Sequence, residues 1–301
     1  MRIYPAKGGI EVTMPTDPKQ YQTAMAFRKA LEDRLKNIAE AEAVPLDRLR
    51  RRVSFDRLLA RLFDPSKQPL WLLKGGYALE FRFQKIARAT KDIDFSIPKM
   101  KEPTKERIHE LLQDEVKKDI PDWFEFLIGV PTVDLDRAVY GGWRYPVTAR
   151  VDNRKFSEFH LDVGVGDALI SEPEWQKGSE ILSFAGIDPV TVALLPKDQQ
   201  FAEKIHSYTY PRELREFSRT KDMVDIVLLI DQGLPEKQQL VKAIQATFSR
   251  RESHDVPQEL QIPPAVIAPT YNTMAIECGV SRKTMNEAFQ YISDYWKQLY
   301  G

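Results

Sequence analysis

The spacing of apolar residues divides the chain into a helical beginning, a mixed middle and a helical end. From Tyr21 to Ala41, and again from Leu46 to Leu62, apolar residues recur at intervals of three and four, the period of an amphipathic helix. The run Leu70–Leu73 and the alternating residues 91–97 have instead the patterns of a buried and a half-buried strand. The helical period returns after Pro189. We therefore predict helices, then a mixed α/β core, then helices again.

The same patterns define the individual elements and three candidate parts. Strands are predicted at residues 70–73, 91–97, 123–130, 144–151 and 159–165, with helices at 77–83, 106–116, 198–208, 221–231, 235–249 and 281–300. The proline-rich stretch 257–269 is predicted to be a stiff connection. The expected parts are an N-terminal helical segment packed on the core (1–66), a core (67–188) and a C-terminal helical domain (189–301).

The composition excludes several classes of protein but does not by itself identify one. Over 301 residues, 44 Lys and Arg balance 44 Asp and Glu, so any nucleic-acid binding must come from a local basic patch. The single cysteine, Cys278, excludes a disulfide framework and a four-cysteine zinc site. No run approaches the length of a membrane helix and no signal-peptide core is visible, so we expect a soluble cytoplasmic protein without membrane contact.

The strongest chemical signal is a glycine pair followed by paired carboxylates. Gly75 and Gly76 separate a predicted strand from a helix, where backbone N–H groups can bind phosphate. Asp92 and Asp94 lie two apart on a predicted strand, so both project from one face. Such carboxylates bind hard divalent cations, Mg²⁺ or Mn²⁺. Taken singly, an Asp-x-Asp is usually a solvated strand face and a Gly-Gly usually a turn; their order favours phosphoryl chemistry.

Two later segments supply further candidates. Asp162 lies among apolar residues of a predicted strand, where a buried carboxylate needs a partner; a metal shared with Asp92 and Asp94 would be one. Asp167 follows a glycine and is more typical of a turn. Lys204 on one helix could reach a triphosphate, although it could instead be an ordinary surface lysine. Asp222 near the start of the next helix could act in the site or favour the helix dipole.

Together these motifs resemble the AbiEii/AbiGii toxin family of nucleotidyltransferases. The similar segments are Leu73–Leu79, Arg88–Phe95, Leu161–Asp167, Glu203–His206 and Ser218–Asp225, in the order found in that family. The resemblance implies the α/β (α+β) fold of the DNA polymerase β-like nucleotidyltransferases: a mixed sheet with flanking helices, followed here by a C-terminal helical domain. It implies metal-dependent transfer of a nucleotide from an NTP by the toxin of an abortive-infection toxin–antitoxin pair.

The resemblance also implies roles for single residues. Asp92, Asp94 and Asp162 would bind the metal and act in catalysis, together with Lys204 and Asp222. The nucleotide would contact Gly75, Gly76, Arg88, Thr90, Lys204 and Arg219. Tyr77 departs from the family, which commonly has a small hydroxyl residue after the glycine pair. This departure bears on the nucleotide contacts, not on the carboxylates.

The acceptor and the partners follow from the same comparison. For some family members the acceptor is the 3′ end of tRNA, which we expect here too, and the cognate antitoxin is expected to be a winged-helix regulator encoded nearby. Arg48, Arg50, Arg51, Arg52, Arg57 and Arg61 could contact RNA phosphates or form a solvated helix face, and Arg212, Arg215, Arg219 and Lys221 form a second basic cluster. Two alternatives stay open: transfer to a protein hydroxyl, and a non-catalytic binding protein on the same fold.

Overall fold

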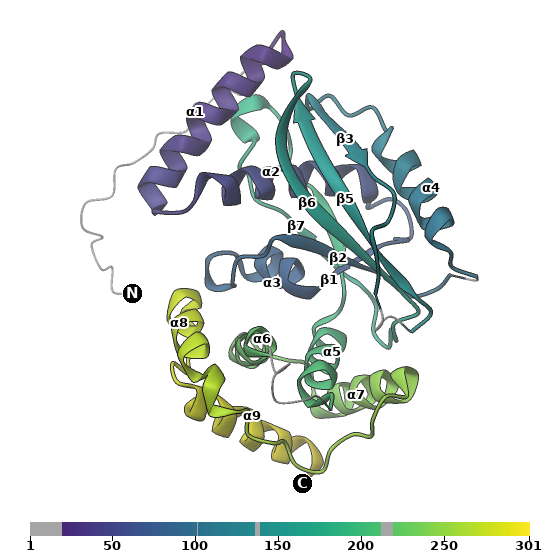
Figure 1. The fold of residues 1–301 in the computed structure, drawn as a ribbon, viewed down its shortest axis with the longest axis vertical. Helices are drawn as coiled ribbons and strands as arrows, with labels where there is room; N and C mark the ends of the chain where they lie inside the picture. The colour runs from purple at the N-terminus through teal and green to yellow at the C-terminus, as the bar shows by residue number, and fades with distance from the viewer. Residues whose placement is uncertain (1–19, 101, 136–138, 212–218) are drawn as a thin grey trace.

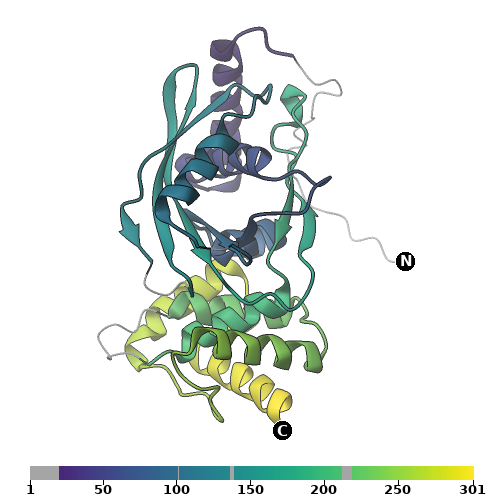
Figure 2. The same cartoon turned by 90° about the vertical axis from the view of Figure 1, so that its right-hand side faces the viewer.

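The protein consists of a half built around a β-sheet and a half built of helices (Figures 1 and 2). The computed structural model describes residues 20–100, 102–135, 139–211 and 219–301. The sheet half contains the helices α1 (Ala24–Glu42), α2 (Leu46–Leu62), α3 (Gly75–Phe83) and α4 (Lys105–Val116). The helical half contains α5 (Lys197–Thr209), α6 (Thr220–Asp231), α7 (Lys237–Arg251), α8 (Ala268–Cys278) and α9 (Met285–Tyr300).

Eight strands of the described residues form one mixed sheet. They are β1 (Leu72–Lys74), β2 (Asp92–Ile97), β3 (Phe124–Ile128), β4 (Val133–Asp134), β5 (Gly142–Val151), β6 (Arg154–Val165), β7 (Glu174–Lys177) and β8 (Thr191–Leu194). The spatial order is β3-β5-β6-β2-β1-β8-β7, with β4 added beside β5. Strand β2 runs parallel to β6 and antiparallel to β1. The predicted mixed sheet with flanking helices is confirmed.

Local sequence explains where several elements begin and turn. The Thr23 hydroxyl accepts the Ala26 N–H at the start of α1, and Thr284 and Glu287 form a reciprocal capping box at α9. Strands β5 and β6 form a hairpin whose turn residues Asp152 and Asn153 both have φ of 55°. Asp and Asn tolerate this left-handed conformation, so the chain turns at these two residues.

Alternation along β2 gives its two faces opposite characters. Ile93, Phe95 and Ile97 are fully buried, and the Phe95 ring lies 5.9 Å from that of Phe63 at the end of α2. The intervening residues Asp92 and Asp94 therefore project from the other face. That face is turned towards the helical half, where α5 and α6 pack on each other around a second apolar cluster that includes Phe201, Val224 and Trp296.

The structure adds elements that the sequence patterns did not predict. β8 pairs with β1, although the stretch after Pro189 was predicted to be helical. Its four residues are too few to separate a strand from a helix by periodicity. The predicted proline-rich connection is wrong at its end, because α8 begins at Ala268 with Pro269 in its first turn. Proline fits there because the first N–H groups of a helix have no intrahelical partner.

Candidate active site

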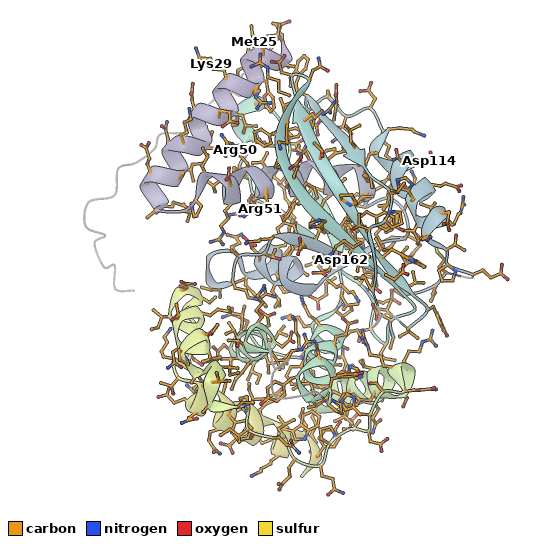
Figure 3. All side chains as sticks on the ribbon, viewed as in Figure 1. Met25, Lys29, Arg50, Arg51, Asp114 and Asp162 are labelled. Carbon is orange, nitrogen blue, oxygen red and sulfur yellow. The ribbon has the colours of Figure 1, made fainter. Side chains whose placement is uncertain are left out.

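Two adjacent strands bring the predicted carboxylates to one face of the sheet. In the parallel pairing of β2 with β6, Asp94 lies directly opposite Asp162, and Asp92 lies opposite His160. The buried neighbours Ile93 and Leu161 point to the opposite face. Figure 3 shows Asp162 on the lower part of the sheet, towards the helical half. The three aspartates therefore share the face that the alternation predicts.

The glycine pair fits closely against this carboxylate face. Gly75 has φ of +66°, and a Cβ added there would lie 2.2 Å from Oδ2 of Asp94. A Cβ on Gly76 would lie 2.7 Å from Nη2 of Arg88. The Gln200 side chain of α5 fixes the turn by donating a hydrogen bond of 2.9 Å to the Gly75 carbonyl. Glycine is thus required for the approach of the turn to Asp94 and Arg88, in addition to the backbone conformation.

A cavity of about 570 Å³ separates the sheet from the helical half at this point. It is lined by Lys74, Gly75, Gly76, Arg88, Asp94, Arg144, Gln200, Glu203, Lys204, Ser207, Arg219, Lys221, Asp222 and Arg251. Lys204 and the glycine pair therefore lie on one cavity, contributed by the two halves of the chain. Basic side chains outnumber carboxylates in this lining, which suits a polyanionic ligand.

Asp94 is the carboxylate most affected by its surroundings. Burial raises its pKa to about 6, and the neighbouring charge of Asp162 acts in the same direction. Lys74, Lys204 and Arg88 oppose the rise. A carboxylate with a raised pKa, held beside a second carboxylate, gains from a cation placed between them.

Asp162 has a partner that the sequence did not reveal. Arg144 on β5 donates from Nε to Oδ1 at 2.7 Å and from Nη2 to Oδ2 at 2.6 Å. Nη2 also lies 3.9 Å from Oδ2 of Asp92, whose Oδ1 is 3.4 Å from Nδ1 of His160. The hydrogen bonds to Asp162 raise the pKa of Arg144 above its usual range. The two residues lie 18 positions apart in the sequence and meet only when β5 pairs with β6, so no local motif reveals the pair.

The helical half contributes a second charged cluster. Lys204 Nζ lies 2.9 Å from Oδ1 of Asp222 and 2.8 Å from Oδ2 of Asp225. Burial lowers the pKa of Lys204, but these two carboxylates outweigh it and hold the pKa above its usual range. Arg219 donates to Asp222 at 2.9 Å, and Arg88 of the sheet half binds both oxygens of Asp225 at 3.0 Å. Asp225, to which the sequence gave no role, thus joins the two halves.

A third cluster lies beside the glycine turn. Lys74 donates to Asp167 and lies 3.6 Å from Glu203, and Arg251 of α7 lies 2.8 Å from Asp167. Burial raises the pKa of Asp167, but Lys74 and Arg251 outweigh this effect and lower it to about 2. The prediction of a turn residue at Asp167 therefore misses a buried ionic contact that links the segment after β6 to α7. Glu203 and Arg251 are site residues that the sequence analysis did not single out.

Some predicted residues lie elsewhere. Thr90 does not line the cavity; its N–H donates to Glu80 and its hydroxyl to the Asp92 carbonyl. Tyr77 is buried, with its ring centroid 4.7 Å from that of Phe55, so the side chain at this position faces the core. The RNA-contact and solvated-face interpretations are both wrong for Arg57 and Arg61, which are buried in ion pairs with Asp56 and Asp122.

Other arginines of this stretch are also engaged. Arg48 is paired with Glu80 at 3.2 Å, and Arg50 with Glu32 at 2.7 Å. Arg212 and Arg215 of the second basic cluster lie outside the described residues, whereas Arg219 and Lys221 line the cavity. Four of the six arginines of this stretch are therefore held in ion pairs, whereas Arg219 and Lys221 of the second cluster lie at the cavity.

The donor set at the carboxylate face fits a hard divalent cation. Asp94 lies beside Asp162, and the pKa of Asp94 is raised. The space beside the Asp94 carboxylate exists because Gly75 has no side chain. In the described part of the chain, no three Asp, Glu, His or Cys side chains are already grouped to hold a metal ion. At the third position, Arg144 donates hydrogen bonds to both oxygens of Asp162.

The fold and the family match together define a nucleotidyltransferase. The family described as "Nucleotidyl transferase AbiEii toxin, Type IV TA system" matches residues 57–293, and the chain belongs to this family. Among solved structures the fold is similar to MenT4, a nucleotidyltransferase toxin from Mycobacterium tuberculosis H37Rv, with a TM-score of 0.53. That match has 16% sequence identity and covers 77% of this chain and 75% of the other. The predicted family and fold are confirmed.

The remaining comparisons add less. No curated protein matches the chain at a significant level. Membership of a type IV toxin–antitoxin family implies an NTP substrate and an antitoxin partner. Among the described residues, no helix has both the length and the apolar character needed to cross a membrane.

Proposed function

We propose that the cavity binds an NTP with Mg²⁺ or Mn²⁺ and transfers its nucleotidyl group to the 3′ hydroxyl of tRNA. The observation that carries this proposal is the position of Asp94. Its carboxylate, with a pKa of about 6, faces Asp162 at the edge of a cavity lined by a glycine turn and basic side chains. A volume of about 570 Å³ is within the usual range of small-molecule sites.

The triphosphate would lie between the glycine turn and α5. Arg88 and Lys204 face this space from opposite halves and are held by Asp225. Arg219 and Asp222 complete the same side of the cavity. These cations would neutralise the phosphate oxygens, and their fixed ion pairs would orient the chain of phosphates. Of the residues predicted to contact nucleotide, Thr90 would act only indirectly, through its hydrogen bond to the Asp92 carbonyl.

Asp92, Asp94 and Asp162 would hold the divalent cation. When bound, the cation would stabilise the charge that develops on the phosphate oxygens during an in-line displacement. The requirement that Asp94 be ionised sets a lower pH limit for this role, because a protonated carboxyl is a poor ligand.

The transfer itself forms one bond and breaks one. The acceptor hydroxyl oxygen bonds to the α-phosphorus, and the bond from this phosphorus to the oxygen bridging the α- and β-phosphates breaks, releasing pyrophosphate. The hydroxyl proton passes to the carboxylate of Asp162, which lies next to Asp94 on the neighbouring strand. Lys204, Arg88 and Arg219 face the departing pyrophosphate charge.

tRNA is favoured as acceptor by the charge around the cavity mouth. Lys221 is exposed and lines the cavity, and the Arg144 side chain is 33% exposed. These groups can contact a phosphate backbone next to a free 3′ hydroxyl, whereas a protein acceptor requires no such cations. The proposed antitoxin, a winged-helix regulator encoded nearby, would oppose this activity in the cell.

The acceptor is tested by incubating the purified protein with total RNA and total protein extract. Each of the four NTPs, labelled at the α-phosphate, is supplied separately with Mg²⁺, and Asp94→Asn is the control. We expect a labelled tRNA band for the wild type alone. A labelled protein band with unlabelled tRNA would contradict the acceptor, and no labelled product in either fraction would contradict the transfer.

A further inference from the structure

The Arg144–Asp162 ion pair conflicts with the role proposed for Asp162. Both oxygens of this carboxylate accept hydrogen bonds from one guanidinium, at 2.7 and 2.6 Å. In that state Asp162 is not free to take a proton from an acceptor hydroxyl or to ligate a cation. The pair also differs from an ordinary surface salt bridge in its burial, because the Asp162 side chain is only 12% exposed.

The two partners differ in their freedom to move. The backbone of Asp162 is paired on both sides, with β2 and β5. The Arg144 backbone is paired with Val133 and Asp162, and its carbonyl accepts the Thr132 N–H at 2.9 Å. The Arg144 side chain is nevertheless 33% exposed. Its guanidinium can therefore reorient by side-chain rotation while the strands stay in place.

The Arg144 guanidinium also faces the cavity in which the triphosphate is proposed to bind. Arg144 lines the same cavity as Lys204, Arg219 and the glycine pair. A guanidinium binds phosphate oxygens with the same two-pronged geometry that it uses for a carboxylate. A triphosphate carries more negative charge than one carboxylate, and in this cavity it would meet several other cations.

We propose that Arg144 exchanges partners during nucleotide binding. Without nucleotide it holds Asp162; with nucleotide it binds a phosphate and releases Asp162 to the acceptor hydroxyl and the cation. Arg144 is thus a nucleotide-contacting residue and, through Asp162, a positioning residue. This inference rests on the proposed function, and it predicts that nucleotide binding prepares the third carboxylate.

The direct test is Mn²⁺ binding without nucleotide, measured by the electron paramagnetic resonance signal of free Mn²⁺. Arg144→Gln removes the guanidinium, and we expect it to bind Mn²⁺ about tenfold more tightly than the wild type, equivalent to about 1.4 kcal/mol. The double variant Arg144→Gln/Asp162→Asn is expected to lose this gain. Arg150→Gln, on the same strand but paired opposite Lys155, is the matched control and is expected to match the wild type.

The second measurement is binding of labelled NTP in EDTA. We expect about tenfold weaker binding for Arg144→Gln and no change for Arg150→Gln. Should Arg144→Gln not fold, as judged by circular dichroism, Arg144→Lys is expected to change both affinities in the same directions by a smaller factor. A folded Arg144→Gln with the Mn²⁺ affinity of the wild type would overturn the exchange. Failure of the wild type to bind any NTP, both in EDTA and with Mg²⁺, would instead overturn the proposed function.

Discussion

Asp94 shows how a single side chain links stability to chemistry. Its carboxylate lies against Gly75, beside Asp162 and within reach of the charges of Lys74, Lys204 and Arg88. Burial and Asp162 together raise its pKa from 3.8 to about 6. The folded protein therefore disfavours the ionised form that cation binding requires. A functional group held in this way costs stability at neutral pH.

Asp94→Asn is predicted to stabilise the metal-free protein at neutral pH. Because the folded-state pKa is raised, the stability associated with the protonated group is present below about pH 3.8 and is lost as the pH rises through about 6. The asparagine variant has no such loss. At pH 7 its free energy of unfolding should exceed that of the wild type by about 1–3 kcal/mol, since one pKa unit is about 1.4 kcal/mol.

Urea unfolding in EDTA at several pH values measures this difference. The gap between variant and wild type should narrow as the pH falls from about 6 to about 4. A variant less stable than the wild type at pH 7, or a gap independent of pH, would show that Asp94 is not strained in this way.

Gly75→Ala is predicted to be more damaging than a matched glycine change elsewhere. Gly279 has a similar φ of +68° but nothing within 4 Å of an added Cβ, whereas at Gly75 the Cβ would meet Asp94 at 2.2 Å. Gly279→Ala should lose about 1 kcal/mol from backbone strain alone. Gly75→Ala should lose more and should bind NTP at least about tenfold more weakly. Equal stability and equal NTP affinity for the two variants would contradict the claim that the close approach of Gly75 to Asp94 requires glycine.

At the scale of elements, the sequence revealed the helical and strand periods but not which strands and side chains pair with each other. The helical and strand patterns correctly located β2, α5, α6 and the second half of β6, and the Asp-x-Asp alternation correctly placed Asp92 and Asp94 on one face. The pairing of Arg144 with Asp162 depends on the register of β5 with β6, which no local pattern encodes. The same limit applies to β8, whose strand character depends on its contact with β1.

Helix α2 shows that a run of arginines can be structural. Arg61 donates two hydrogen bonds to Asp122 and one to the Phe124 carbonyl, and both charged side chains are buried. The arginines thus connect α2 to the segment before β3. In sequence, this stretch is indistinguishable from an RNA-binding helix, because the carboxylate partner lies 61 residues away.

Arg61→Met is therefore predicted to destabilise the protein by about 3–5 kcal/mol, because it leaves the carboxylate of Asp122 buried without its main partner. Arg51→Met, on the same helix but half-buried and outside this ion pair, should cost about 1 kcal/mol or less. Thermal or urea unfolding compares the two variants. Similar stabilities for both would contradict the structural role of Arg61.

At the scale of the whole molecule, ion pairs across the cavity join the two halves. Arg88 of the sheet half binds Asp225 of α6, and Lys74 lies near Glu203 of α5. The candidate site depends on this arrangement, because the carboxylates come from the sheet and Lys204 from the helical half. The family resemblance in the sequence already implied that Lys204 belongs to the site. The places of Glu203, Asp225 and Arg251 in the site became visible only from the contacts in the structure.

The position of the basic residues predicts where RNA contacts the protein. Lys221→Glu, at the cavity, should weaken labelling of tRNA without weakening NTP binding by the same factor, because the exposed side chain contacts the acceptor. Arg51→Glu on α2 should leave tRNA labelling unchanged; Figure 3 shows Arg51 apart from Asp162, near α2. Titration of tRNA at fixed NTP tests both variants. A loss for Arg51→Glu alone would move the RNA contact to α2.

The position of the transferred label tests nucleotidyl transfer most directly. The wild type and Asp94→Asn are incubated with Mg²⁺, tRNA and the preferred NTP, labelled at either the α- or the γ-phosphate. Attack at the α-phosphorus predicts labelled tRNA from the α-labelled NTP, labelled pyrophosphate from the γ-labelled NTP, and neither product with Asp94→Asn. Label reaching the acceptor from the γ-phosphate, or unchanged transfer by Asp94→Asn, would contradict nucleotidyl transfer at this site.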